Sequence, residues 1–163
     1  MDRLQQTSLT GALGKATLAA GTTSTISTTG TLPFAIRGMA YSHAALTNQA
    51  TPTTDANTGV GFLGVKAGFG SVFVYGYNAA GTLLCAQGEV IALDISSTYA
   101  WKQKPQLPAL PDDFCPFGAL TILAGATADA VTGWIQGTSN QAAVTGITYA
   151  RTDFALGMPD QLV

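Results

Sequence analysis

Residues 68–93 carry the pattern that most restricts how this chain can fold. From 68 to 78, large side chains alternate with small ones, as on the two faces of an extended strand. The ring-bearing positions on one face are Phe73, Tyr75 and Tyr77. Residues 78–81, Asn-Ala-Ala-Gly, have the composition of a tight turn, and an apolar return strand follows at 83–93. The pattern therefore predicts a β-hairpin over 69–93.

Shorter strand-like segments recur along the rest of the chain and are separated by turn residues, with 19 glycines and seven prolines in all. Two short threonine-rich strands are expected within 15–31, with Leu18 and Ile26 facing inward. The other expected strands are 33–42, 117–124, 134–137 and 146–154. About eight short strands with almost no helical periodicity predict an all-β fold, a compact β-sandwich or barrel of jelly-roll-like form.

Two long connections stand out from this pattern. The segment 47–61 is polar and aperiodic, and a loop of that length in a small domain is usually functional. Residues 94–114 hold prolines at a Pro-x-x-Pro-x-x-Pro spacing, which favours an extended crossover outside the sheets. Trp101 lies in this crossover next to two lysines, so it either contacts a sugar or nucleic acid or attaches the crossover to the core.

The 163 residues suit a single β-domain over 15–163, preceded by a polar N-terminal arm over 1–14. Three leucines are scattered in this arm: Leu4, Leu9 and Leu13. We expect them to anchor the arm to a partner protein or to a neighbouring subunit, since such a segment gains order on binding.

Composition narrows the function. Seven basic and nine acidic residues give a net charge of −2, so the basic surface of a nucleic-acid-binding protein is missing. No apolar stretch approaches the roughly 20 residues of a membrane-spanning helix, and no secretory signal is recognisable. Cys85 and Cys115 are expected to be buried free thiols, with a disulfide between them as the alternative.

Three motifs that resemble active-site signatures have simpler explanations. Residues 59–64 match G-x-G-x-x-G but follow a polar loop rather than a strand, so we expect a glycine-rich strand entry. His43 is the only histidine, and no nucleophile elbow accompanies it. Asp112 and Asp113 are neighbours, which suits a turn after Pro111 better than a facing acid pair, although a weak calcium site stays open. We therefore expect no enzyme, no cofactor and no metal site.

Four stretches taken together, 34–50, 74–89, 107–118 and 137–149, resemble small structural proteins of tailed-bacteriophage and prophage virions, of the head decoration or head-fibre kind. The resemblance implies a β-rich homotrimer attached to a capsid or other virion protein after synthesis in the bacterial cytoplasm. It carries no catalytic motif. The C-terminal residues 158–163 depart from the longer tails of such proteins, which leaves the end that attaches undefined.

Three functions follow from these observations. The first is a structural virion protein, supported also by 47% hydrophobic against 10% charged residues, a composition that favours burial of surface between subunits. The second is a host-surface or carbohydrate-binding module of a phage fibre, in which Phe73, Tyr75 and Tyr77 stack on sugar rings instead of packing in the core or a subunit interface. The third, a glycan hydrolase, is disfavoured by the scarcity of acid–base groups.

Overall fold

A computed structural model describes residues 9–94, 96 and 99–155, and it contains 12 strands and no helix over these residues. The all-β class predicted from the sequence is confirmed. In chain order the strands are β1 (Gly11–Ala12), β2 (Ala19–Ala20), β3 (Thr25–Ser27), β4 (Leu32–Ile36), β5 (Met39–His43), β6 (Gln49–Ala50), β7 (Phe69–Tyr77), β8 (Leu83–Gln87), β9 (Ile91–Asp94), β10 (Ala100–Trp101), β11 (Cys115–Ala124) and β12 (Ile147–Asp153).

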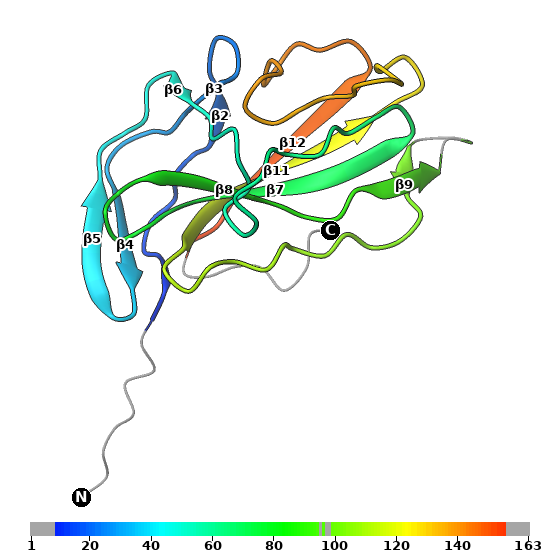
Figure 1. Cartoon of the computed structure of the whole chain (residues 1–163). Coiled ribbons are helices and arrows are strands. Elements are labelled where there is room, and N and C mark those ends of the chain that lie inside the picture. Colours follow the sequence, from blue (N-terminus) through cyan, green and yellow to red (C-terminus); the bar gives the residue numbers. More distant parts are fainter. Residues whose placement is uncertain (1–8, 95, 97–98, 156–163) are drawn as a thin grey trace, which may run out of the picture.

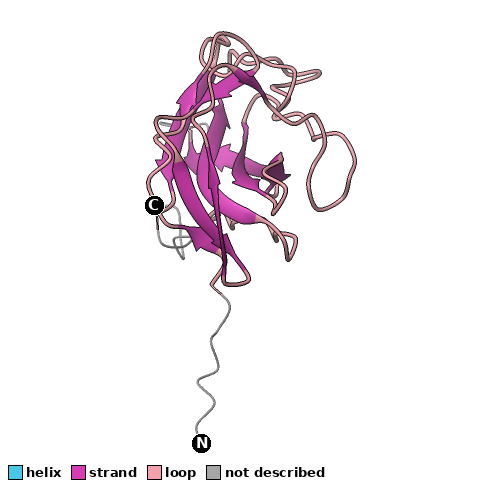
Figure 2. Ribbon diagram, turned by 90° about the vertical axis from the view of Figure 1, so that its left-hand side faces the viewer, coloured by secondary structure: helices cyan, strands magenta, loops and turns pink. Residues whose placement is uncertain are grey.

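The strands form one large sheet and two small ones (Figure 1). The large sheet has the order β10-β9-β7-β11-β12, and β8 also pairs with β7. The small sheets have the orders β1-β4-β5 and β2-β3-β6. All pairs of strands are antiparallel, and Figure 2 shows that the strands curl around a common interior as in half of a barrel.

The predicted central hairpin is present. The N–H of Gly81 donates to the carbonyl oxygen of Asn78 at 2.9 Å, and Gly81 has a φ of 76°, a left-handed conformation that glycine adopts without strain. The return strand is divided, however, because residues 88–90 interrupt the ladder between β8 and β9. Both halves pair with β7, β8 with its C-terminal half and β9 with its first residues.

The number of strands exceeds the expected eight. Four of them, β1, β2, β6 and β10, are only two residues long. A side-chain alternation with a period of two cannot be recognised in two residues, so these strands form through pairing with distant partners and leave no local pattern.

The single strand predicted over 33–42 is wrong. The chain reverses there in a two-residue turn, and β4 and β5 pair with each other. Arg37 and Gly38 have φ angles of 50° and 78°, which match the right-handed twist of a tight hairpin. An arginine rarely adopts such a conformation, so the sequence lacked the usual Asn-Gly signal.

The strand predicted over 134–137 is also wrong. Trp134 makes only an isolated bridge to Val65, and its indole N–H donates to the carbonyl oxygen of Asn140 at 2.9 Å. The stretch is therefore an irregular loop. It contributes one large buried side chain, the indole of Trp134, to the core. Its apolar content resembles that of a strand, but the stretch has no neighbouring strand with which to form a ladder.

The large sheet buries both of its faces. The main core lies on the face that looks toward the small sheets and includes Phe34, Tyr77, Phe117 and Trp134. A second, smaller core lies on the other face. It contains Val72, Val74 and Ala119 from the sheet, together with Phe114 and Phe154. Leu107 and Leu110 of the proline-rich crossover cover this second core. The crossover does not run wholly outside the sheets as expected, because its residues Ala100–Trp101 form β10 and pair with β9.

The expected arm over 1–14 is described only from residue 9. Gly11 and Ala12 are buried as β1, and they pair with Ala35 and Phe34 of β4. The N–H of Gly38 also donates to the carbonyl oxygen of Leu9 at 2.9 Å. The described end of this segment is therefore part of a sheet, and ordered structure begins before residue 15.

Candidate functional site

The three rings expected on one face of the central strand lie together in the main core. Phe73, Tyr75 and Tyr77 are each at most 1% exposed. The ring centroids of Phe73 and Trp134 are 5.3 Å apart, edge to face, and those of Tyr77 and Phe117 are 4.9 Å apart. These contacts are typical of core packing, and none of the three rings offers an exposed surface to a sugar.

Tyr75 also anchors a buried polar cluster that the sequence did not indicate. Its hydroxyl donates to Oε1 of Gln136 at 2.9 Å, and Nε2 of Gln141 donates to the same oxygen at 3.2 Å. Both glutamines are buried, and burial raises the pKa of the Tyr75 phenol well above its usual value. The cluster fastens the loop that follows Trp134 to the central strand.

The other sequence candidates lie apart from these rings. Trp101 is half-buried and packs on the second core, where its ring fills the space beside Gly70. This contact supports the interpretation that it attaches the crossover. Leu9 and Leu13 are 52% and 39% exposed, and Leu4 lies outside the described residues.

The residues of the motifs that resemble active-site signatures make packing, turn and ion-pair contacts. The ring of His43 stacks on Tyr77 with centroids 4.3 Å apart, and its Nδ1 donates to the carbonyl oxygen of Ala44 at 2.7 Å. Asp112 lies in the predicted turn. The N–H of Phe114 donates to the carbonyl oxygen of Pro111 at 3.0 Å and closes this turn. Its carboxylate forms an exposed ion pair with Arg37 at 3.6 Å.

Both cysteines are buried free thiols, as expected. Burial raises the pKa of Cys115 to about 11 and that of Cys85 well above its usual value. Neither thiol is therefore activated as a nucleophile. Over residues 9–94, 96 and 99–155, no three His, Cys, Asp or Glu side chains are grouped so that they could hold a metal ion.

A hollow lies where the long polar loop meets the edge of the large sheet. Asp55 fixes the loop, because its carboxylate accepts hydrogen bonds from the N–H and hydroxyl of Thr58 and from the N–H of Gln87. The N–H of Ala56 donates to the carbonyl oxygen of Cys85 at 2.8 Å. These bonds lie along the side of β8 that does not face β7, so the loop covers this edge.

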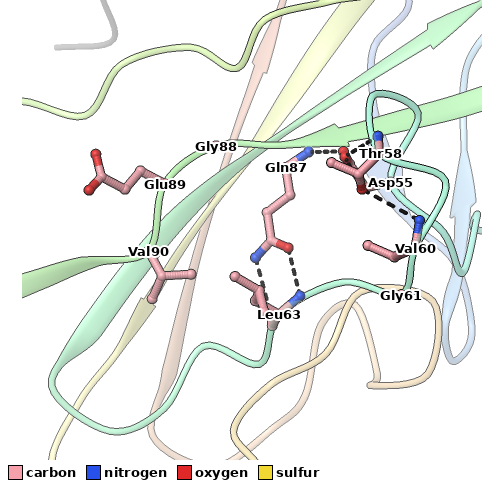
Figure 3. Close-up of a pocket in the computed structure, with 9 residues that line it drawn as sticks. All are labelled: Asp55, Thr58, Val60, Gly61, Leu63, Gln87, Gly88, Glu89 and Val90. Carbon is pink, nitrogen blue, oxygen red and sulfur yellow. Dashed lines mark hydrogen bonds between the residues drawn. The ribbon is translucent and has the colours of Figure 1, made fainter.

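Gln87 extends the contact beyond the end of β8 (Figure 3). Its side-chain amide accepts from the N–H of Leu63 at 2.8 Å and donates to the carbonyl oxygen of the same residue at 2.9 Å, like a neighbouring strand. Between this docked loop and residues 88–90 an open pocket of about 430 Å³ remains. The sequence indicated a functional loop at 47–61, but a bond between positions 24 residues apart has no local signal.

Three apolar side chains line the pocket beside the polar side chains of Asp55, Thr58, Gln87 and Glu89. Val60, Leu63 and Val90 line it, and Val90 also lines an adjoining hollow together with Phe69. Val60, Leu63 and Phe69 are 62%, 68% and 40% exposed. We call these four residues, Val60, Leu63, Phe69 and Val90, the apolar surface. Such an arrangement is suited to contact with another macromolecule and lacks the enclosure of a small-molecule site.

Comparison of the chain with protein-family models, with curated proteins and with solved structures gives no significant match. No helix among the described residues is long and apolar enough to cross a membrane.

Proposed function

We propose that this protein is a structural component of a tailed-bacteriophage virion, where it decorates the capsid or forms part of a head fibre or attachment. It is made in the bacterial cytoplasm and assembles as a homotrimer without a cofactor. Two lines of support converge on this role. One is the resemblance of four sequence stretches to virion proteins of this kind, and the other is the apolar surface.

The apolar surface is the observation that carries the proposal. Three of its side chains are exposed, and all three lie within one stretch of ten residues, from Val60 to Phe69. Apolar side chains scattered singly over a protein are ordinary, but a group around one hollow favours association. With only 10% charged residues, the chain has few groups to keep such a surface solvated. In a virion, neighbouring subunits cover it permanently.

The trimer is the finer part of the proposal. Closed rotational symmetry is the usual outcome when copies of one chain associate, and three-fold positions are available on an icosahedral shell. A sugar-binding role has less support, because the aromatic platform that it requires is buried in the core.

The decisive experiment examines phage particles induced from the bacterial strain that encodes the chain. We expect mass spectrometry of density-purified particles to detect this chain in amounts comparable with other minor structural proteins. Antibodies raised against the recombinant protein should label the particle surface in electron micrographs. A chain that stays with the cell lysate and is absent from intact particles would refute the proposal.

A pair of variants tests the apolar surface itself. Leu63→Ser removes an exposed apolar side chain, while the Gln87 contacts use only its backbone. We expect this variant to lose particle binding and its molar mass in solution to fall by a factor of three. Met39→Ser is the matched control, because Met39 is similarly exposed but lies next to the turn between β4 and β5. Equal behaviour of the two variants would contradict the assignment.

A further inference from the structure

Strand β12 is the outermost strand at one side of the large sheet. It pairs with β11 over seven consecutive positions without a register shift, and nothing else in the described part of the chain pairs with its other side. Its side chains alternate between half-buried and exposed along the whole length. The strand is thus long, regular and open on one edge.

Two hydrogen bonds at opposite ends of the ladder show which backbone groups face outward. The N–H of Phe154 donates to Phe117, and the N–H of Gly125 donates to Gly146. In an antiparallel ladder alternate residues bond to the same neighbour, so the even-numbered residues of β12 bond to β11. The N–H and C=O groups of Tyr149, Arg151 and Asp153 therefore point away from the sheet.

The open edge of β12 has few of the devices by which proteins protect edge strands. It contains no proline, lysine or bulge. Its two charged residues, Arg151 and Asp153, lie on the half-buried face. Residues 15–18 reach only the C-terminal end of the strand, where the N–H of Leu18 donates to the carboxylate of Asp153 at 2.8 Å. The opposite situation exists at β8, where the loop held by Asp55 and Gln87 covers the edge. A regular edge of this length whose backbone groups have no partner along most of the strand favours the addition of another strand.

We propose that two copies of this chain associate by pairing their β12 strands antiparallel about a two-fold axis at Ala150. This is the only register in which all seven residues of both strands pair and the outward-facing N–H and C=O groups of one strand bond to those of the other. It forms about six new main-chain hydrogen bonds, because the N–H of Ile147 already donates to Val144. A second copy is the occupant because the strand is complementary to itself.

The residues that face each other in this register are compatible. Arg151 lies opposite the partner's Tyr149, and within one chain the same guanidinium already lies 5.7 Å from the Tyr149 ring. A shift of the axis to residue 151 would instead set two arginines directly opposite each other, which is unfavourable. On the exposed face, Thr148 lies opposite the partner's Thr152, and Ala150 faces its own copy.

This contact is separate from the apolar surface and does not depend on a role in a virion. A two-fold contact combined with a three-fold one gives six chains in closed symmetry, and alone it gives two. In both cases its loss halves the molar mass, whereas loss of the apolar contact divides the mass by three. The two proposals can therefore fail independently.

Cysteine pairing tests the register directly. The residue on the axis is the only one that meets itself, at a Cα separation of about 4.5 Å that suits a disulfide. We expect Ala150→Cys to give a disulfide-linked dimer under mild oxidation, seen on a non-reducing gel. Thr148→Cys alone should stay unlinked but should link to Thr152→Cys when the two are mixed. The native thiols are buried and should give no background.

A charge at the axis tests whether the contact forms in the unmodified protein. Ala150→Lys places two ammonium groups side by side, so we expect the molar mass by light scattering to be half that of the wild type. Ala126→Lys, another exposed position, should leave the mass unchanged. A wild-type and an Ala150→Lys protein of equal mass would overturn the proposal, as would linking of Thr148→Cys to itself as efficient as that of Ala150→Cys.

Discussion

Truncation of Tyr75 should unfold this protein more readily than any change at an exposed position. The side chain is completely buried, and it stabilises the fold both through its ring and through its hydroxyl. Tyr75→Ala removes the ring from the main core and leaves a cavity. Removal of a buried aromatic side chain costs about 3–5 kcal/mol of unfolding free energy. In a chain of this size that loss lowers the melting temperature by roughly 10 °C.

Tyr75→Phe separates the two contributions. It keeps the ring and removes only the hydrogen bond to Gln136, so we expect a loss of about 1–2 kcal/mol. Urea titrations followed by circular dichroism measure both values. Val131→Ala serves as the control, because Val131 is almost fully exposed and its truncation should change stability by less than about 0.5 kcal/mol.

The result that would refute this reasoning is an unchanged urea midpoint for Tyr75→Ala. If the same variant also lost affinity for a bacterial glycan, the ring would have to be exposed and the sugar-stacking hypothesis would replace core packing. A loss of stability with unchanged surface binding agrees with the structure.

Three further outcomes are expected. Cys85 and Cys115 should not react with an aromatic disulfide reagent at pH 8 in the native protein and should react fully in urea, since burial raises both thiol pKa values. The melting temperature should be level below about pH 9 and fall toward pH 12, because burial raises the pKa of Cys115 to about 11 and that of Tyr77 to about 12, so the unfolded chain loses these protons first. Gly76→Ala should lower the free energy of unfolding, measured by urea titration, by at least about 1–3 kcal/mol, because its Cβ would lie 2.5 Å from the carbonyl oxygen of Cys115 and would collide with the Phe114 ring.

Local pattern was sufficient where neighbouring residues in the chain also pair in the sheet. The hairpin of β7 and β8 was predictable because its turn has suitable residues and its strand alternates over nine positions. The hairpin of β4 and β5 was missed because Arg37 occupies a turn position that usually needs glycine or asparagine. The conformation of this turn is imposed by the pairing of the strands on both sides, and no single residue in the sequence indicates it.

The candidate site was predictable only in outline. The length and polarity of 47–61 indicated a functional loop, but the pocket itself depends on Gln87, which imitates a strand toward Leu63. The exposure of Val60 and Leu63 follows from that docking and not from their hydrophobicity. A sequence pattern shows which side chains are apolar, whereas only the tertiary contacts decide which of them are left outside.

The loop over β8 has a consequence for how far association can proceed. An edge that is already occupied cannot accept a further strand. The large sheet can therefore lengthen only through β12 or through β10, and β10 is only two residues long. Once two copies have joined through β12, each remaining edge of the combined sheet consists of β8, covered by its loop, and of β10, which is very short. Growth stops at a defined size, and the chain is protected from the open-ended stacking that leads to fibrils.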